Sequence, residues 1–212
     1  EAQESRREKS FGFPIASGLK QKDRYTIIGP KSFLSGYAAR NVDGTINVVV
    51  EIPTGTVEKW EVSKPDGKLK WDFKDGKPRK VAYLGYPGNY GMIPQTLLSK
   101  NMGGDGDPLD ILVLGPAVAR GSIVRVKIIG VLKLLDGGEQ DDKLIAVMPG
   151  TRLGKVKSLV ELQKKFHGIS SIVEIWFCNY KGPGKIKSKG YADRVQAAKI
   201  LHAACRAYTG QK

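Results

Sequence analysis

The sequence predicts an α+β domain in which the strands come first and the helices last. Short apolar runs separated by Gly, Pro and Asp occupy residues 46–148, and apolar residues with helical spacing occupy the last 45 residues or so. Runs of strands followed by runs of helices are typical of α+β architecture. Many short strands with such turn signals indicate a small barrel or a sandwich.

Six segments have the pattern of strands. Pro53 ends the first of them, and Pro65-Asp66-Gly67 and Asp75–Pro78 are turn signals between later ones. None of the apolar runs approaches the ~18 residues of a membrane span. The expected strands cover residues 46–52, 57–62, 69–73, 111–114, 123–134 and 144–148.

Two helices are expected after the strands. From Ile169 to Tyr180, apolar residues recur at i, i+3, i+4, i+7, i+8 and i+11, which places them on one face of a helix. Gly182-Pro183-Gly184 ends that helix. Residues 192–208 are rich in Ala and in other helix formers, and Asp193 is suited to cap this second helix.

Residues 1–45 are interpreted as an N-terminal arm or extension with little regular structure, and residues 46–212 as the folded domain. The chain begins with Glu1 rather than Met, and residues 1–10 are polar, so no signal peptide is expected. The cytoplasm is the default location, and an organelle or the periplasm stays open because the initiator Met is missing.

The charge balance is strongly basic. Thirty-five Lys and Arg face 21 Asp and Glu, which gives a net charge of +14. A field of this sign attracts phosphorylated small molecules, nucleic acid or an anionic membrane surface, and a merely solvated basic surface is the simple alternative. Cys178 and Cys205 do not make a disulfide framework, and His167 and His202 lack the spacing of zinc ligands.

Three aspartates, Asp105, Asp107 and Asp110, lie in a Gly-rich segment directly before an apolar strand. Carboxylates so close together repel one another, and hard divalent cations relieve that repulsion. A calcium EF-hand is excluded, because its sixth and twelfth positions would be Asp110 and Pro116 instead of Gly and Glu. A solvated turn rich in Asp and Gly is the alternative.

A second acidic cluster follows the longest strand and contains Asp136, Glu139, Asp141 and Asp142. A polar hairpin loop explains this cluster on its own. Together with the first cluster it suggests a metal site, because acids are otherwise scarce in this chain. Phosphoryl chemistry needs carboxylates, divalent metal and cations in one place. The candidate cations are Lys59, Arg79, Lys143 and Lys181.

The segment Asp105-Gly-Asp-Pro-Leu-Asp110 resembles the signature of the soluble family I inorganic pyrophosphatases. Further segments resemble that family in the same order along the chain, from about Ile46 to Tyr208. They are Glu51-Ile-Pro53, Lys59-Trp-Glu61, Tyr86-Pro-Gly-Asn-Tyr-Gly91, Gly130–Lys143 and Asn179-Tyr-Lys181.

The resemblance implies a five-stranded OB-like closed β-barrel flanked by C-terminal helices, with residues 46–212 as the catalytic domain. It also implies Mg²⁺-dependent hydrolysis of pyrophosphate to two phosphates by a metal-bridged hydroxide, with several Mg²⁺ ions per site and Asp107 as general base. The implied metal ligands are Asp105, Asp110, Asp136 and Asp141. Glu51 and Glu61 would lie behind these ligands and support them without necessarily touching the metal. Glu51 would do so through water.

By the same resemblance, the phosphates would be held by Lys59, Arg79, Tyr90, Lys143, Tyr180 and Lys181. The implied partners are pyrophosphate and further copies of the chain. A hexamer is favoured, with a dimer as the alternative, and no nucleic acid is expected to bind. The competing interpretation is a basic OB-like module that binds nucleic acid, since OB-like barrels often bind single strands.

The sequence departs from the family pattern at four places. Gly137 stands where bacterial members usually have Glu, and Arg79 lies one residue closer to Tyr86 than expected, so Lys80 could replace it as the phosphate ligand. Residues 99–104 resemble an insertion. The segment 181–189 has four Lys and no acid, and we interpret it as extra attraction for an anionic substrate or as a solvated loop.

Overall fold

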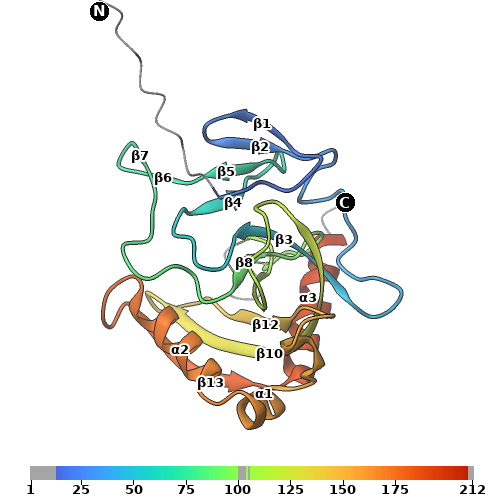
Figure 1. Ribbon diagram of the computed structural model, residues 1–212, viewed down its shortest axis with the longest axis vertical. Helices are drawn as coiled ribbons and strands as arrows, with labels where there is room; N and C mark the ends of the chain where they lie inside the picture. Colours follow the sequence, from blue (N-terminus) through green and yellow to red (C-terminus); the bar gives the residue numbers. More distant parts are fainter. Residues whose placement is uncertain (1–12, 100–103, 105, 210–212) are drawn as a thin grey trace, which may run out of the picture.

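A seven-stranded sheet forms the centre of the computed structural model, which describes residues 13–99, 104 and 106–209 (Figure 1). Its buried strands are rich in Val, Ile and Leu, as expected for strands covered on both faces. They are β3 (Ile46–Ile52), β8 (Asn89–Met92), β9 (Asp110–Leu114), β10 (Ile123–Asp136) and β12 (Lys143–Val147), with the short β11 (Glu139–Gln140) and β13 (Ile186–Ala192) beside β10.

The long strand β10 pairs with β3 and with β12 along different parts of its length. Its first residues pair with β3, from Ile123 opposite Val49 to Val126 opposite Ile46. Its next residues pair with β12, from Lys127 opposite Val147 to Leu132 opposite Lys143, with a register irregularity between Ile128 and Gly130. Because β3 also pairs with β8, β8 with β9, and β9 with β12, the pairings of these five strands run in a cycle.

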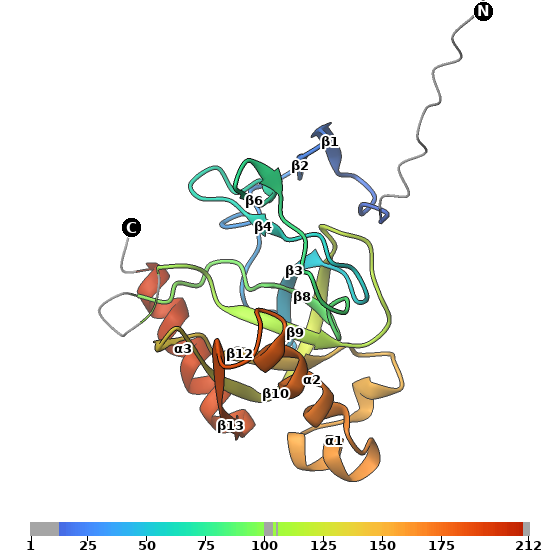
Figure 2. The same cartoon turned by 90° about the vertical axis from the view of Figure 1, so that its left-hand side faces the viewer.

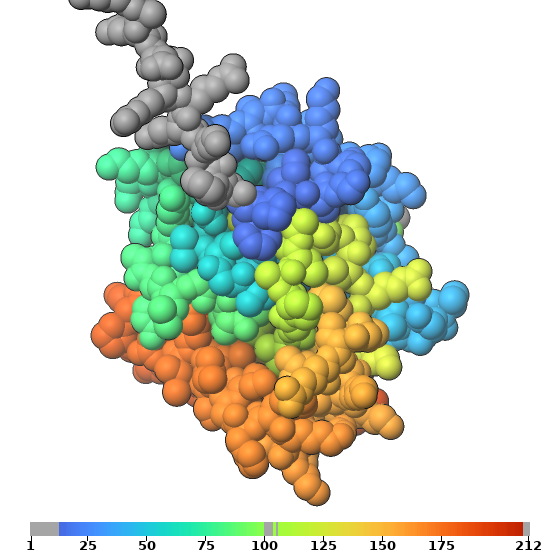
Figure 3. Space-filling model, viewed as in Figure 1, coloured from blue at the N-terminus to red at the C-terminus, as the bar shows by residue number. Residues whose placement is uncertain are grey.

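A smaller four-stranded sheet packs beside this one. It contains β1 (Lys20–Asp23), β2 (Thr26–Ile28), β5 (Leu69–Trp71) and β4 (Trp60–Val62), and a short hairpin joins β6 (Phe73–Lys74) to β7 (Lys77–Pro78). The expectation of little regular structure before residue 46 is therefore wrong for residues 20–28. Ile27 and Phe33 are buried in one core cluster with Trp60 and Leu69, which ties this segment to the body. In Figure 3 the blue surface of this segment lies against the rest of the molecule.

Helices cover two sides of the large sheet, as the two views show (Figures 1 and 2). The helices are α1 (Leu159–Lys165), α2 (Ile169–Asn179) and α3 (Arg194–Thr209), with a 3-10 turn, η2, at Leu153–Lys155. Helix α2 buries Val173, Trp176 and Phe177 in one core, and α3 packs on β10 around another. None of the helices in the described ranges has the length and apolarity to cross a membrane.

The predicted α+β class and both predicted helices are confirmed. The carboxylate of Asp193 accepts the N–H of Gln196 at 2.9 Å, so it caps α3 as expected. Strand β8 was missed because Asn89 and Gly91 resemble turn residues. Strand β13 was missed because its lysines resemble a solvated loop. The expected strand at 57–62 is shorter, since β4 begins at Trp60.

Candidate active site

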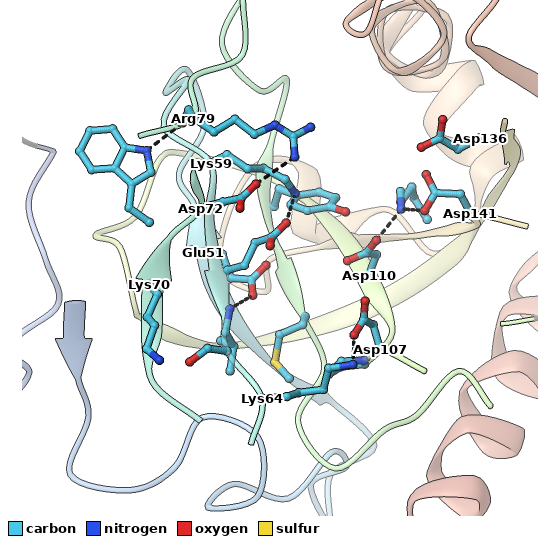
Figure 4. A pocket seen from close by; sticks show the side chains of 18 of the residues that line it. Glu51, Lys59, Lys64, Lys70, Asp72, Arg79, Asp107, Asp110, Asp136 and Asp141 are labelled. Atoms are coloured by element: carbon cyan, nitrogen blue, oxygen red, sulfur yellow. Dashed lines mark hydrogen bonds and ion pairs between the residues drawn. The ribbon is translucent and has the colours of Figure 1, made fainter. Parts of the chain in front are cut away.

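A cavity of about 620 Å³ opens between the two sheets (Figure 4). Every site residue predicted from the sequence lines it except Asp105, which lies outside the described residues. These twelve residues are Glu51, Lys59, Glu61, Arg79, Tyr90, Asp107, Asp110, Asp136, Asp141, Lys143, Tyr180 and Lys181.

Strand register places the first acidic cluster beside the second. Strands β9 and β12 are parallel neighbours with Ile111 opposite Leu144, so Asp110 and Lys143 begin their strands side by side. The Lys143 ammonium lies 2.5 Å from the Asp110 carboxylate and also pairs with Asp141, two residues earlier. Figure 4 shows these two carboxylates on either side of the shared ammonium. Lys143 is almost completely buried, with 4% of its side chain exposed.

Tyr90 reaches the cavity from β8, which approaches β3 very closely. A Cβ on Gly91 would lie 1.8 Å from the carbonyl oxygen of Val49, so only glycine permits this pairing. The Tyr90 ring lies 5.3 Å from the Lys59 ammonium and 5.9 Å from that of Lys143. Tyr86 is buried against Tyr90 and Trp176, outside the cavity lining, which supports a packing role.

The end of β10 brings Asp136 to the opposite wall. The chain turns there through Gly137 and Gly138, both at positive φ, before Glu139 pairs with Asp136. This conformation explains a glycine at position 137. Lys181, just after α2, forms an ion pair with Asp136. The neighbouring Tyr180 ring stacks on Trp176 at 4.7 Å, which fixes its position at the cavity.

Glu51, Lys59 and Glu61 form a third wall, at the junction of β3 and β4. The Lys59 ammonium lies 2.9 Å from the Glu61 carboxylate. Glu51 is buried, and its carboxylate accepts the N–H of Val62 at 2.6 Å. That bond links β3 to β4 and joins the two sheets at the cavity.

Arg79, and not Lys80, points into the cavity. The Arg79 guanidinium pairs with the Asp72 carboxylate at 2.9 Å. The backbone N–H of Arg79 also donates to the carbonyl of Asp72 at 2.7 Å. The indole N–H of Trp71 donates to the Arg79 carbonyl at 2.8 Å, which further fixes this segment. Lys80 instead lies over the Trp71 ring, 5.9 Å from its centroid.

Asp107 lies in the turn before β9, where Lys64 pairs with its carboxylate. Lys64 also donates to the carbonyl of Gly106 at 2.8 Å. Lys64 and Asp72 are residues that the sequence reasoning missed. Lys64 lies in a turn and Asp72 between β5 and β6, and no periodic pattern distinguishes either from a solvated residue.

The charges in the cavity change the protonation of its acids and bases. Burial opposes ionisation of Asp110, but Lys143 and Lys59 outweigh it and lower the pKa of its carboxyl group. For Asp141 burial prevails over the attraction of Lys143, and its pKa is raised. Burial also raises the pKa of Glu51 to about 8, against the attraction of Lys59. Burial would lower the pKa of Lys143, but Asp110 and Asp141 raise it overall.

Two acids of the second cluster do not reach the cavity. Asp142 is buried and accepts the N–H of Leu134 at 3.1 Å, while Glu139 is exposed in the hairpin. Among residues 13–99, 104 and 106–209, no three acidic, thiol or imidazole side chains form a preassembled metal cluster. The carboxylates of the cavity nevertheless suit a hard divalent cation, because the Lys143 ammonium already lies between two of them.

Comparison with known proteins places this cavity in context. The family model described as inorganic pyrophosphatase matches residues 48–209. An inorganic pyrophosphatase of Gluconobacter oxydans is 37% identical over 172 residues, which cover 76% of this chain and 90% of the relative. That of Drosophila melanogaster is 38% identical over 74% of this chain and 51% of the relative. The chain therefore spans about half the length of the Drosophila melanogaster relative. It covers a similar share, 48%, of the inorganic pyrophosphatase 1 of Caenorhabditis elegans.

Solved structures agree with the sequence matches. The type I inorganic pyrophosphatase of Toxoplasma gondii superposes with a TM-score of 0.84 at 26% identity, over 94% of this chain and 98% of that one. The inorganic pyrophosphatase of Helicobacter pylori superposes with a TM-score of 0.68 at 31% identity, over 82% of this chain and 98% of that one. The family model, the relatives and the shared fold together show that this chain belongs to the family I inorganic pyrophosphatases.

Proposed function

We propose that this chain hydrolyses inorganic pyrophosphate to two phosphate ions with Mg²⁺ as the cofactor. The observation that carries this proposal is the convergence of carboxylates and cations on one cavity, in a member of the pyrophosphatase family. Carboxylates attract divalent metal, and the cations attract the phosphate oxygens of the substrate. The cavity is formed by segments that are far apart in the sequence, so the convergence is a property of the fold.

Asp105, Asp110, Asp136 and Asp141 are the proposed metal ligands. Asp110 and Asp141 share a buried ammonium, and Asp136 holds the ammonium of Lys181, so each of these carboxylates already faces a cation. Their donors are oxygen atoms only, which favours Mg²⁺ over softer metals. Bound Mg²⁺ would neutralise phosphate oxygens and lower the pKa of water. Asp105 lies outside the described residues, and its role is carried over from the resemblance alone.

Lys59, Arg79, Lys143 and Lys181 would bind the phosphate oxygens, assisted by the hydroxyl groups of Tyr90 and Tyr180. Arg79 is preferred to Lys80 because it lines the cavity and Asp72 fixes its guanidinium. Asp107 would accept the proton of the attacking water. Its carboxylate is half exposed, so water reaches it, and Lys64 pairs with it. Glu51 and Glu61 would orient Lys59 and water at the edge of the site.

The cycle of five strand pairings supports the proposal of an OB-like closed barrel. Residues 46–212 would be the catalytic domain, and residues 1–45 an extension whose strands β1 and β2 complete the smaller sheet. We further propose a homo-oligomer, with a hexamer favoured over a dimer. The cytoplasm is the proposed location, and the mitochondrial pyrophosphatase of Saccharomyces cerevisiae, 38% identical over 158 residues, keeps an organelle as the alternative.

Phosphate release from pyrophosphate, with and without Mg²⁺, tests the function. Asp107→Asn should lower kcat by about 10²–10⁴-fold, the usual contribution of a general base. Asp23→Asn removes an exposed carboxylate on β1, away from the cavity, and should leave the rate unchanged. A folded protein that releases no phosphate with Mg²⁺, Mn²⁺ or Zn²⁺ would refute the proposal. Salt-dependent binding of single-stranded nucleic acid would then support the alternative module.

A further inference from the structure

A second cavity of about 700 Å³ lies apart from the candidate active site and shares no lining residue with it. It lies between the loop before β3, the middle of β10, the segment around η2 and the first turns of α3. Figure 1 shows the loop before β3, in light blue, on the same side of the molecule as α3. A volume of this size is in the range of small-molecule sites.

The floor of this cavity is apolar. It is formed by Ile46 at the start of β3, Ile129 on β10, Val156 after η2 and Leu201 on α3, all of which belong to the buried core. The partly exposed Ile128 extends this floor toward solvent. Aliphatic side chains offer no hydrogen bonds, so a small inorganic anion gains nothing from this floor. A carbon skeleton gains from the apolar surface that it buries there.

The rim of the cavity is basic. In the described part of the chain, none of its five cations forms an ion pair with another side chain. The five cations are Arg40, Lys127, Lys155, Lys157 and Arg194.

Three carboxylates near this rim are already engaged. Asp193 accepts the N–H of Gln196 at 2.9 Å in the cap of α3. Asp43 accepts the hydroxyl of Thr45 at 2.6 Å and lies 3.8 Å from Arg125. Glu161, which partly offsets Lys157, pairs with Lys165 at 2.5 Å. The rim therefore attracts anions, and only an organic anion satisfies the rim and the floor together.

From this combination we infer that the second cavity binds an organic phosphate monoester. Its phosphate meets the basic rim, and its aliphatic or ring skeleton rests on the floor of Ile46, Val156 and Leu201. The active-site cavity does not suit such a ligand, because charged groups rather than an apolar floor dominate its lining. The inference does not depend on the reaction in the first cavity.

Calorimetric titration with hexyl phosphate tests the inference. A large excess of inorganic phosphate is present throughout, so that it fills anion sites that recognise charge alone. Hexyl phosphate should still bind the full chain. The variant Lys127→Glu/Arg194→Glu should weaken binding at least about tenfold, because two charge-assisted contacts are lost. Both side chains are exposed, and an unchanged thermal transition verifies that the variant folds.

The variant Lys185→Glu/Lys187→Glu is the matched control. It makes the same change of charge at exposed lysines in and beside β13, outside both cavities, and should retain the affinity. Equal losses in both variants would overturn the inference, since they would indicate attraction by net charge alone. Binding that disappears in excess inorganic phosphate would overturn it as well. So would sedimentation that shows copies of the chain associating through this face and separating in Lys127→Glu/Arg194→Glu.

Discussion

Glu51 makes the stability of the metal-free protein depend on pH. Its carboxyl group is buried and accepts the N–H of Val62, and burial raises its pKa from 4.5 to about 8. Between these two values the unfolded chain has lost this proton and the folded chain keeps it. The free energy of unfolding therefore falls as pH rises, by about 1.4 kcal/mol per pH unit between these two values. The stability that the protonated Glu51 contributes is complete below pH 4.5 and is lost above about pH 8.

Glu51→Gln removes the titration and keeps the shape and the acceptor for Val62. The difference in unfolding free energy between this variant and the original chain should thus increase in favour of the variant as pH rises. Over the interval from 4.5 to about 8, the change sums to about 5 kcal/mol. Contributions from titrating groups that do not interact with Glu51 cancel in the difference.

Urea unfolding in EDTA, followed by tryptophan fluorescence at a series of pH values, measures this difference. Glu139→Gln, an exposed carboxylate outside the cavity, controls for the loss of one acidic group. A difference for Glu51→Gln that stays constant between pH 5 and about 9 would refute the reasoning. It would mean that Lys59 holds Glu51 ionised in the folded protein.

Three further perturbations follow from the contacts. Lys143→Met should destabilise the metal-free chain by about 3–5 kcal/mol in urea unfolding, because Asp110 and Asp141 lose their shared cation; a loss below 1 kcal/mol would contradict this. Arg79→Ala should lower kcat/KM for pyrophosphate at least about 10²-fold and Lys80→Ala less than about 3-fold, and the reverse order would assign the phosphate to Lys80. Asp193→Ala should cost about 1 kcal/mol through the lost cap of α3, whereas Asp193→Asn should keep most of the stability; equal unfolding midpoints for all three proteins would exclude a capping role.

Local patterns predicted much of the fold. The spacing of Val173, Trp176 and Phe177 gave the buried face of α2, and the apolar run at 46–52 gave β3 with its observed bounds. Strand β13 could not be found in this way, because its pairing with β10 is formed with a distant segment. The strands before residue 46 were missed for a similar reason, since β2 is stabilised by β5 and by the core around Trp60.

The candidate site was predicted mainly by the order of short segments along the chain. That order brought twelve described residues to one cavity, whereas composition alone indicated only an affinity for anions. Charge contacts outside the strands were not predictable. The pair of Lys64 with Asp107 joins two segments that are far apart in the sequence, and the pair of Asp72 with Arg79 closes the base of the β6–β7 hairpin.

The double pairing of β10 has a consequence for the kinetics of folding. Its contacts with β12 join neighbouring segments, whereas Ile123 must find Val49 across about a third of the chain. Closing a loop of that length costs entropy before any contact compensates for it, and folding rates fall as contacts become less local. The β10–β12 hairpin is therefore expected to form early. The junction of β10 with β3 is expected to close late and to limit the rate at which the cavity is assembled.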